Sequence, residues 1–307
     1  MIRRRGVALI MALLMVAIGT IVVAALIDEG QLALARTRNQ VREQQAYHYA
    51  RGLEAYAFEV LRRDQADGDR VDSAQDLWAN GLPPMDIPGG RLAGRMRDLN
   101  GCLNINRLMA GEHIDAVQQQ RWRRLLITLK LDPDLLDAII DWIDADSVSL
   151  PRGAEDLSYL LLDPPYRAAN QPMRHVSELR LVRGVDAAVF ATLEPHVCAA
   201  SANAPLNINT ATVPVLMTLA DGMSEAVARR IHNEGRARYP DVAALVNQLR
   251  QEGLEPGNTD DLAVHSTLFL AESMIELDTI ELNYFSVIER AGAGTPLRVI
   301  ARSRGVF

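Results

Sequence analysis

Five carboxylates lie close together in the middle of the sequence. Asp141, Asp144 and Asp146 come at the end of a predicted helix, and Glu155 and Asp156 follow in the next loop. Calcium takes about six to eight oxygen ligands and needs no cysteine or histidine. We therefore predict a calcium site with Asp144, Asp146, Glu155 and Asp156 as the favoured ligands and Asp141 as a weaker candidate. The spacing is not that of an EF-hand, and solvated carboxylates without an ion are the alternative.

The chain has two cysteines, Cys102 and Cys198. Two are too few for a disulfide-rich scaffold or a cysteine zinc site, but they suit one bridge in an oxidising compartment. Each precedes by a few residues a phrase that occurs twice, Leu-Asn-Ile-Asn at 103–106 and at 206–209. If the two phrases lie close together, so do the sulfurs. We expect a disulfide, with two buried free thiols as the alternative.

Catalytic motifs are absent from the sequence. The six histidines are scattered, and there is no Gly-x-Ser-x-Gly elbow, P-loop or His-Glu-x-x-His pattern. Acidic residues outnumber basic ones by 39 to 32, so the formal charge is −7, which disfavours nucleic acid as the main partner. We therefore predict a protein that is not an enzyme.

A helix-hairpin-helix pattern follows Leu206 and suggests one alternative function, that of a membrane-anchored extracytoplasmic DNA-binding protein. Its hairpin, 220–223, holds one glycine beside Asp221, which makes a poor phosphate cradle. Structural use of the hairpin is therefore favoured over DNA binding. A basic face would distinguish the two, and it would have to come from the arginines at 229, 230, 236 and 238.

The N-terminal residues predict a membrane anchor. The range 7–27 carries no charge over about 21 residues, enough to span a ~30 Å hydrocarbon core. Arginines at 3–5 precede it and acids at 28–29 follow it, so the N-terminus is expected in the cytoplasm and the bulk outside. A cleaved secretory signal is disfavoured because the run is long and continues as an amphipathic pattern. We predict one helix over 7–63, with a kink near Gly19 or Gly30 left open.

The rest of the chain predicts a sheet interrupted by helices. After a turn-rich stretch at 80–90, alternation favours a strand at 91–97, and three antiparallel strands follow Thr267, the last two joined by a turn at 292–294. Between them the sequence favours a compact helical domain of roughly 150 residues. The predicted helices are 115–129, 132–143, 176–181, 187–194, 213–219, 224–233 and 242–248, with a core that includes Leu125, Leu126, Leu129, Leu136, Ile139, Ile140 and Ile143. The fold class is α+β, a long N-terminal helix packed on a small antiparallel sheet and interrupted by a large all-α insertion.

The short basic leader that ends in Gly6, followed directly by an apolar helix, resembles the type IV prepilin class. The resemblance implies cleavage by prepilin peptidase between Gly6 and Val7. Members ordinarily carry a glutamate at the fifth position of the mature helix, where this chain has Met11. A carboxylate in lipid is expensive unless it is paired, so its absence suits a subunit with no other subunit above it.

Several local phrases resemble the type II secretion system protein K family. They are the runs at 138–146, 153–156, 165–170, 176–181 and 205–211, and the resemblance extends from the leader to about Arg302. It implies a pilin-like α/β domain interrupted by an α-domain with bound calcium. The implied role is a non-enzymatic minor pseudopilin, the tip, cap or initiator of a periplasmic pseudopilus that promotes export of folded proteins across the outer membrane. The implied partners are minor pseudopilins I and J, with minor pseudopilin H, the major pseudopilin, prepilin peptidase and the inner membrane, and no nucleic acid.

Together these observations divide the chain into five parts. We predict a leader at 1–6, a single transmembrane helix at 7–27, the first part of a pilin-like domain at 28–107, an inserted α-helical domain at 108–265 and the C-terminal pilin-like strands at 266–307.

Overall fold

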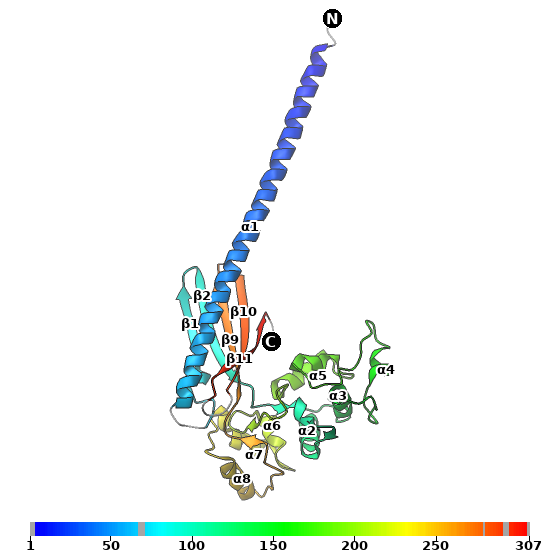
Figure 1. Cartoon of the computed structure of the whole chain (residues 1–307), viewed down its shortest axis with the longest axis vertical. Coiled ribbons are helices and arrows are strands. Elements are labelled where there is room, and N and C mark those ends of the chain that lie inside the picture. The colour runs from blue at the N-terminus through cyan, green and yellow to red at the C-terminus, as the bar shows by residue number, and fades with distance from the viewer. Residues whose placement is uncertain (1–3, 67–70, 279, 291–294, 306–307) are drawn as a thin grey trace.

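A continuous helix dominates the structure. The computed structural model describes residues 4–66, 71–278, 280–290 and 295–305, with side chains from residue 8 onward. Helix α1, Arg4–Ala66, has 63 residues and passes through Gly19 and Gly30 without interruption (Figure 1). This confirms the single predicted helix over 7–63.

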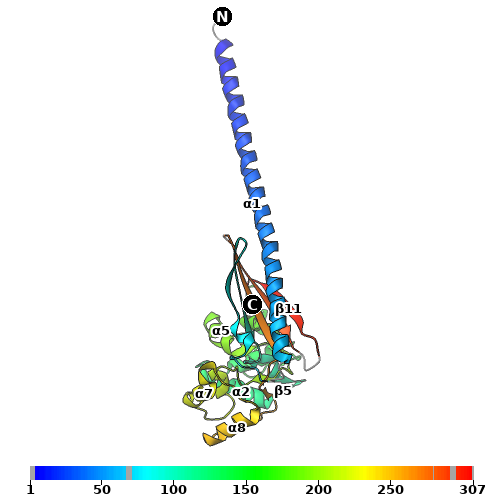
Figure 2. The ribbon, with the colours of Figure 1, turned by 90° about the vertical axis from the view of Figure 1, so that its left-hand side faces the viewer.

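The N-terminal part of α1 stands free of the rest of the molecule (Figures 1 and 2). It is the one helix among the described residues that is long and apolar enough to cross a membrane, with a mean hydropathy of 2.9 over its best window and none of that window buried. The first buried side chain of α1 is Ala46. Residues 8–27 therefore contribute nothing to any described core.

The C-terminal part of α1 packs on a five-stranded antiparallel sheet of order β1-β2-β9-β10-β11. The strands are β1 Leu82–Ile87, β2 Gly90–Asp98, β9 Leu268–Leu277, β10 Ile280–Glu289 and β11 Arg298–Arg304. β2 lies before the inserted region in the sequence and β9 after it, and the two pair from Gly90↔Leu277 to Asp98↔Phe269. The insertion therefore interrupts one sheet, and the predicted α+β fold class is confirmed.

The main local difference from the sequence analysis is β1. The turn-rich interpretation of 80–90 was wrong for this segment, because Leu82–Ile87 forms a strand despite Pro83 and Pro84. Proline cannot donate a ladder hydrogen bond, and β1 is an edge strand whose register shifts between Leu82 and Met85, so the missing donors are tolerated there. The turn predicted at 292–294 lies outside the described residues.

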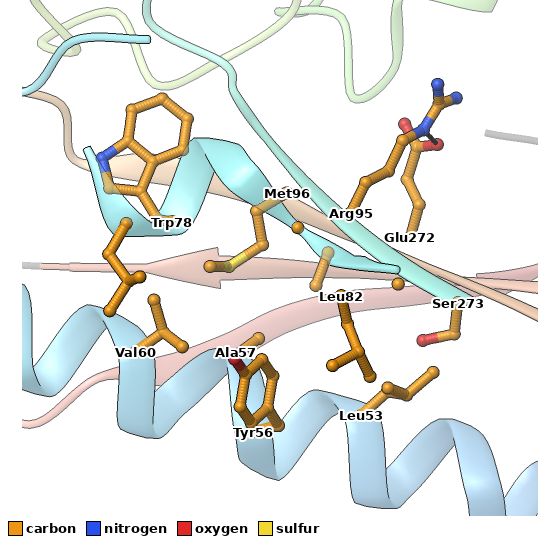
Figure 3. A pocket seen from close by; sticks show the side chains of 14 residues that line it. Leu53, Tyr56, Ala57, Val60, Trp78, Leu82, Arg95, Met96, Glu272 and Ser273 are labelled. Atoms are coloured by element: carbon orange, nitrogen blue, oxygen red, sulfur yellow. Dashed lines mark hydrogen bonds and ion pairs between the residues drawn. The ribbon is translucent and has the colours of Figure 1, made fainter. Parts of the chain in front are cut away.

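Small side chains let α1 approach the sheet closely. Ala46, Ala50 and Ala57 recur at helical spacing and are buried with Leu53 and Leu61 against the sheet. Figure 3 shows a hollow beside this contact, bordered by α1, β2 and the 3₁₀ helix η1, Leu77–Asn80. Its volume of about 20 Å³ admits roughly one water, so it is a packing gap rather than a ligand site.

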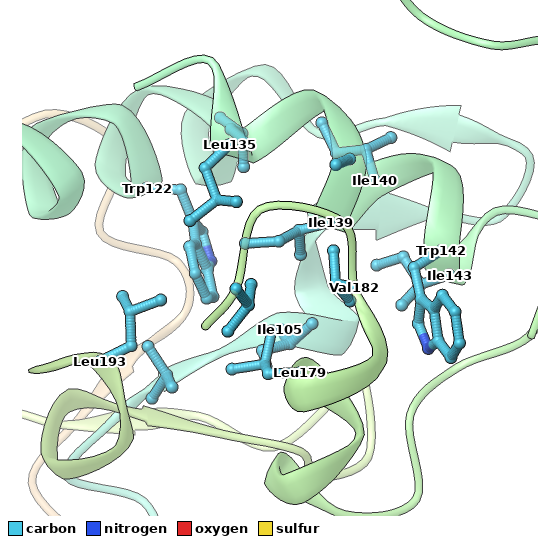
Figure 4. Close-up of a cluster of buried hydrophobic side chains, with 14 of the residues drawn as sticks. Ile105, Trp122, Leu135, Ile139, Ile140, Trp142, Ile143, Leu179, Val182 and Leu193 are labelled. Atoms are coloured by element: carbon cyan, nitrogen blue, oxygen red, sulfur yellow. The ribbon is translucent and has the colours of Figure 1, made fainter. Parts of the chain in front are cut away.

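The inserted region holds two hydrophobic cores. Lobe one, residues 103–197, buries the aromatic and aliphatic side chains shown in Figure 4, among them Trp122, Ile139 and Leu179. Lobe two, residues 206–262, has its own cluster around Ile208 and Leu245. Of the core residues predicted here, Leu129 is partly buried and the others are buried. The region was expected to be one compact helical unit, and two separate clusters fill it instead.

The seven predicted helices are present, with 176–181 as a 3₁₀ helix. The short helix Asp156–Tyr159 and the short strand pairs that close each lobe were not predicted. Lobe one has β3 Leu103–Asn104, η2 Ile105–Leu108, β4 Met109–Ala110, β5 His113–Ile114, α2 Ala116–Thr128, α3 Leu135–Ile143, α4 Asp156–Tyr159, η3 Val176–Leu181, α5 Ala187–Leu193, η4 Glu194–His196 and β6 Val197–Cys198. Lobe two has β7 Leu206–Asn207, α6 Val213–Met217, α7 Glu225–His232, η5 Asn233–Gly235, α8 Val242–Gln251 and β8 Leu262–Ala263.

The repeated Leu-Asn-Ile-Asn phrase performs the same task in both lobes. Each phrase supplies one strand of a parallel pair, β3 with β6 and β7 with β8. In lobe one the Asn106 side chain accepts from the backbone N–H of Met173 and donates to its carbonyl, both at 2.8 Å. In lobe two Asn209 makes the same two bonds with Tyr239, at 2.7 and 3.2 Å. The two lobes are therefore built on one repeated backbone clamp.

A buried ion pair joins the lobes to each other. Arg121 of α2 donates to Asp261 at 2.5 Å and to the carbonyl of Asn258 at 2.6 Å, and Gln118 also donates to Asp261 at 2.7 Å. A half-satisfied buried pair is costly, so these additional hydrogen bonds matter to it. Together they hold α2 of lobe one against the end of lobe two.

Candidate metal centre

Three carboxylates converge where α3 ends and α4 begins. Asp141 lies in the last turns of α3, Asp144 is its C-cap, and Glu155 is the N-cap residue of α4. One carboxylate oxygen from each lies within 4.8 Å of the others. The buried apolar face of α3 fixes the rotation of this helix, and the loop from 145 to 154 brings Glu155 back to its end. We call Asp141, Asp144 and Glu155 the carboxylate cluster.

Several oxygens of the carboxylate cluster are buried without a hydrogen-bond partner among the described residues. They are Oδ1 of Asp144 and both Oε atoms of Glu155, whose residues are 8% and 7% exposed. Unpartnered buried carboxylate oxygens are costly, and a bound cation is one way to compensate for them. Asp141 differs, because the backbone N–H of Leu150 donates to its carboxylate at 3.2 Å.

The electrostatics agree with this geometry. Burial, and then the neighbouring charges of Asp146 and Asp141, raises the pKa of Asp144 to about 6. Burial, and then Asp144 and Asp141, raises the pKa of Glu155 to about 7. Burial also raises the pKa of Asp141, although its hydrogen bonds act in the opposite direction. The cluster thus has negative charge that nearby protein groups do not neutralise.

The predicted ligands do not all meet. Asp144 and Glu155 are together, and Asp141, the weaker candidate in the sequence, joins them. Asp146 is exposed and accepts from the backbone N–H of Val148 at 2.7 Å, although it is close enough to raise the pKa of Asp144. Asp156 turns the other way, accepting from the N–H of Ala168 at 3.1 Å and pairing with Arg167 at 3.5 Å.

Two residues beside the cluster were not predicted from the sequence. A Cβ on Gly153 would lie 1.8 Å from Oδ2 of Asp141, so any other residue there would force this carboxylate to move. Asn170 donates to the carbonyl of Asp146 at 2.8 Å, and its Oδ1 is buried without a partner among the described side chains. This oxygen is of the type that calcium prefers. Neither residue stands out in the sequence, because a loop glycine and a loop asparagine are ordinary turn residues.

A second group of acids, Asp64, Asp72 and Asp76, lies at the joint between the sheet and lobe two. Here protein cations are present: Arg290 pairs with Asp64 at 2.8 Å and also with Asp72, and Arg238 pairs with Asp76 at 2.6 Å. These arginines provide the positive charge that a metal would otherwise supply, so this group is a structural ion-pair network.

The cysteines expected to pair are joined in the structure. Cys102 and Cys198 form a disulfide with a Cα–Cα distance of 5.8 Å. The bond lies at the parallel pair of β3 and β6, where Asn104 is opposite Cys198. It therefore links the beginning of lobe one to its end.

The hairpin that suggested DNA binding lies between α6 and α7, and its surroundings are not basic. Arg229 pairs with Glu225 at 2.5 Å and Arg230 with Glu252 at 2.6 Å. Arg236 pairs with Glu234, and Arg238 with Asp76 of the pilin-like part. The four arginines do not form the basic face that DNA binding requires, and each instead pairs with a carboxylate.

The predicted processing position lies at the beginning of α1. Gly6 and Val7 are within the first turns of the helix, but their side chains are not among those described, and Met1 to Arg3 lie outside the described residues.

Comparison with known proteins agrees with this architecture. Two models of the family described as "Type II secretion system (T2SS), protein K" match residues 101–202 and 206–265, which correspond to lobe one and lobe two. The chain is 37% identical to type II secretion system protein K of Pseudomonas aeruginosa, over 98% of this chain and 93% of the relative. It is 31% identical to the protein of that name from Pectobacterium carotovorum, over 99% and 98%.

The structure also resembles a solved one. It matches a chain in the crystal structure of the GspK-GspI-GspJ complex from the type 2 secretion system of enterotoxigenic Escherichia coli. The TM-score is 0.76 at 27% identity, covering 89% of this chain and 100% of the other.

Proposed function

The chain belongs to the type II secretion system protein K family and is a minor pseudopilin, and from this premise we propose that it caps or initiates the periplasmic pseudopilus. Its part in export is that of a structural component of the secretion machinery. The observation that carries the proposal is the width of its head relative to its helix. The lobes extend sideways from the end of the sheet that lies away from the N-terminal part of α1 (Figure 1). A like subunit stacked on that side, away from the membrane, would meet them.

The membrane segment supports the same position. In the mature helix the fifth residue is Met11, which offers no carboxylate to the N-terminal amine of a neighbour. Helix packing in lipid would then hold the subunit in place. We propose processing by prepilin peptidase between Gly6 and Val7 and a single pass through the inner membrane, with the head in the periplasm. The arginines at 3–5 support this orientation.

We further propose minor pseudopilins I and J as direct partners, with minor pseudopilin H and the major pseudopilin below them. A chain beginning at Asp28 keeps every buried side chain of α1, since the first of them is Ala46. Mixed with the soluble domains of I and J, it is expected to elute with both as one complex in size-exclusion chromatography. Elution of three separate species at micromolar concentrations would refute this proposal.

The carboxylate cluster is proposed to hold calcium. Asp141, Asp144 and Glu155 would supply carboxylate oxygens and Asn170 an amide oxygen, an all-oxygen set that fits a hard cation. Bound calcium would compensate the buried negative charge and tie the end of α3 to the start of α4. The resulting function is structural rather than catalytic.

Isothermal titration tests the calcium proposal with a matched pair of variants. Glu155→Gln removes a charge inside the cluster and is expected to weaken calcium binding at least tenfold. Asp156→Asn removes a charge from the adjacent residue, which points to Ala168, and is expected to bind nearly as the wild type does. Equal losses in both variants, or no uptake by the wild type below millimolar calcium, would contradict the proposed ligands.

A further inference from the structure

We propose that the connection between the sheet and the lobes is a pH-sensitive lock, which tightens when Asp98 binds a proton. The insertion leaves the sheet at the end of β2 and returns to it at the beginning of β9, so both of its chain connections lie here. We call residues 98–100, 205–210 and 264–268 the head joint. Figure 1 shows both lobes beyond this end of the sheet, so the head joint determines how firmly they are held relative to α1.

The side chain of Asn100 closes the head joint. Its Oδ1 accepts from the backbone N–H groups of Thr267 and Leu268, at 3.0 and 2.9 Å. Its Nδ2 donates to the carbonyl of Pro205 at 2.8 Å. The backbone N–H of Asn207 donates to the Asn100 carbonyl at 2.9 Å. One residue therefore holds the segment that leaves the sheet, the segment between the lobes and the segment that returns.

Asp98 lies among these hydrogen bonds without a cation to pair with. It is partly buried, and its Oδ1 accepts from the backbone N–H of Asn100 at 2.7 Å. Its Oδ2 accepts from the hydroxyl of Thr210 and, at 3.4 Å, from the amide of Asn207. No described arginine, lysine or histidine forms an ion pair with this carboxylate. Neutral donors compensate a partly buried negative charge only in part.

Only one copy of the Leu-Asn-Ile-Asn phrase has an acid among the described partners of its asparagine side chains. In lobe one, Asn104 and Asn106 donate to backbone carbonyls, at 2.8 Å in each case. In lobe two, Asn207 also reaches the carboxylate of Asp98. The phrase closes lobe one without an acid, so the carboxylate of Asp98 adds a property that the clamp alone does not need.

The described charged groups near Asp98 come from the segments that adjoin the head joint. They are Asp64 of α1, Asp72 and Asp76 before η1, Arg238 of lobe two and Arg290 after β10. Both arginines pair with the other acids of this set and not with Asp98. Arg97, the preceding residue of β2, points to the opposite face of the strand, where its guanidinium lies 4.0 Å from Glu272. The charge of Asp98 therefore stays uncompensated.

The electrostatics support proton binding at this position. Burial raises the pKa of Asp98 to about 6, and the charge of Asp72 acts in the same direction, although hydrogen bonds oppose the shift. Because this pKa lies above the ordinary value of 3.8, the closed joint binds the proton more tightly than an open one, and the joint is stabilised as the pH falls. From pH 7.5 to pH 5.0 this linkage should lower the equilibrium constant for opening about tenfold.

Three other titratable groups lie near the head joint. Burial, and then a neighbouring acid, raises the pKa of Asp64 to about 6. Burial lowers the pKa of His196, whose Nδ1 lies 2.8 Å from a hydroxyl of lobe two, so its protonation opposes the effect of Asp98. His265 is exposed. A substitution at Asp98 leaves all three in place, so a comparison of this variant with the wild type isolates Asp98.

Hydrogen exchange in the full chain, reconstituted in lipid nanodiscs, tests the lock. The reporters are the backbone N–H groups of Asn207 and Leu268, both of which donate to Asn100. Their protection factors are the measured rates corrected for intrinsic exchange at each pH. From pH 7.5 to pH 5.0 these factors should rise about tenfold more in the wild type than in Asp98→Asn. At pH 7.5 the variant should be about tenfold or more better protected than the wild type, because an amide of the same size carries no buried charge.

Asp76→Asn is the matched control, because Asp76 has its own partner in Arg238. It should lower protection at both pH values and retain the pH dependence of the wild type. An equal rise in the wild type and in Asp98→Asn would overturn the lock. Weaker protection of Asp98→Asn at pH 7.5 would also overturn it, since the charge of Asp98 would then only hold the joint together.

A second variant keeps the test decisive if the melting temperature shows that Asp98→Asn does not fold. Thr210→Val removes a hydroxyl that donates to Asp98 and favours its charged form. The midpoint of the pH dependence should therefore move to higher pH. A midpoint that stays in place or moves to lower pH would refute the inference.

Discussion

Removing the disulfide should destabilise lobe one selectively. The change is the double substitution of Cys102 and Cys198 by serine. The bond spans a sequence separation of 96 residues, and the loop-closure entropy of such a loop sets an upper value of about 4.7 kcal/mol. Because measured values commonly fall below this limit, we expect a loss of about 2–4 kcal/mol. For a unit of this size the melting temperature should fall by roughly 10–20 °C.

Tryptophan fluorescence provides an assay specific to this lobe. Trp122 and Trp142 are buried in lobe one, whereas Trp78 packs against Phe269 at the sheet. In a Trp78→Phe background, denaturant unfolding followed by fluorescence therefore reports on lobe one alone. As a control, a reductant should lower the midpoint of the wild-type cysteine pair and leave that of the serine variant unchanged. A serine variant within about 0.5 kcal/mol of its parent under oxidising conditions would refute this reasoning.

Three further predictions concern other parts of the chain. Asn106→Ala leaves the backbone N–H and carbonyl of Met173 without their buried partner. We expect the free energy of unfolding, measured with denaturant, to fall by about 2–4 kcal/mol. A fall below about 1 kcal/mol would contradict the stabilising role of these two hydrogen bonds. Gly153→Ala forces the Asp141 carboxylate away, so titration should show weaker calcium uptake, and wild-type affinity would disprove the assigned site. Burial raises the pKa of Glu54, but hydrogen bonds from Arg302 and Ser286 outweigh it and place this pKa below its ordinary value of 4.5. The stabilisation by Glu54 is therefore present above about pH 4.5 and is lost as the pH falls further. The free energy of unfolding, measured as a function of pH, should then fall less steeply below pH 4.5 in Glu54→Gln than in the wild type. The same steepness in both proteins would contradict this.

Local patterns determined much of this protein. An uncharged run followed by an amphipathic one is sufficient to predict α1, because helix periodicity is a property of neighbouring residues. The strands β2, β9, β10 and β11 and the main helices of the lobes follow from the same kind of local signal. The cysteine pair and the region of the carboxylate cluster were also visible, since residue type and sequence proximity are enough to nominate them.

The tertiary structure decided which of these residues meet. Glu155 and Asp156 are adjacent in the sequence, yet one enters the carboxylate cluster and the other turns to Ala168. The direction of each side chain depends on how α4 is placed against the core beneath it, including Tyr159. This helix has only four residues, which is too short for a periodic pattern to predict its placement. Lobe one and lobe two are separate for the same reason, because contacts between residues far apart in the sequence define where one core ends and the next begins.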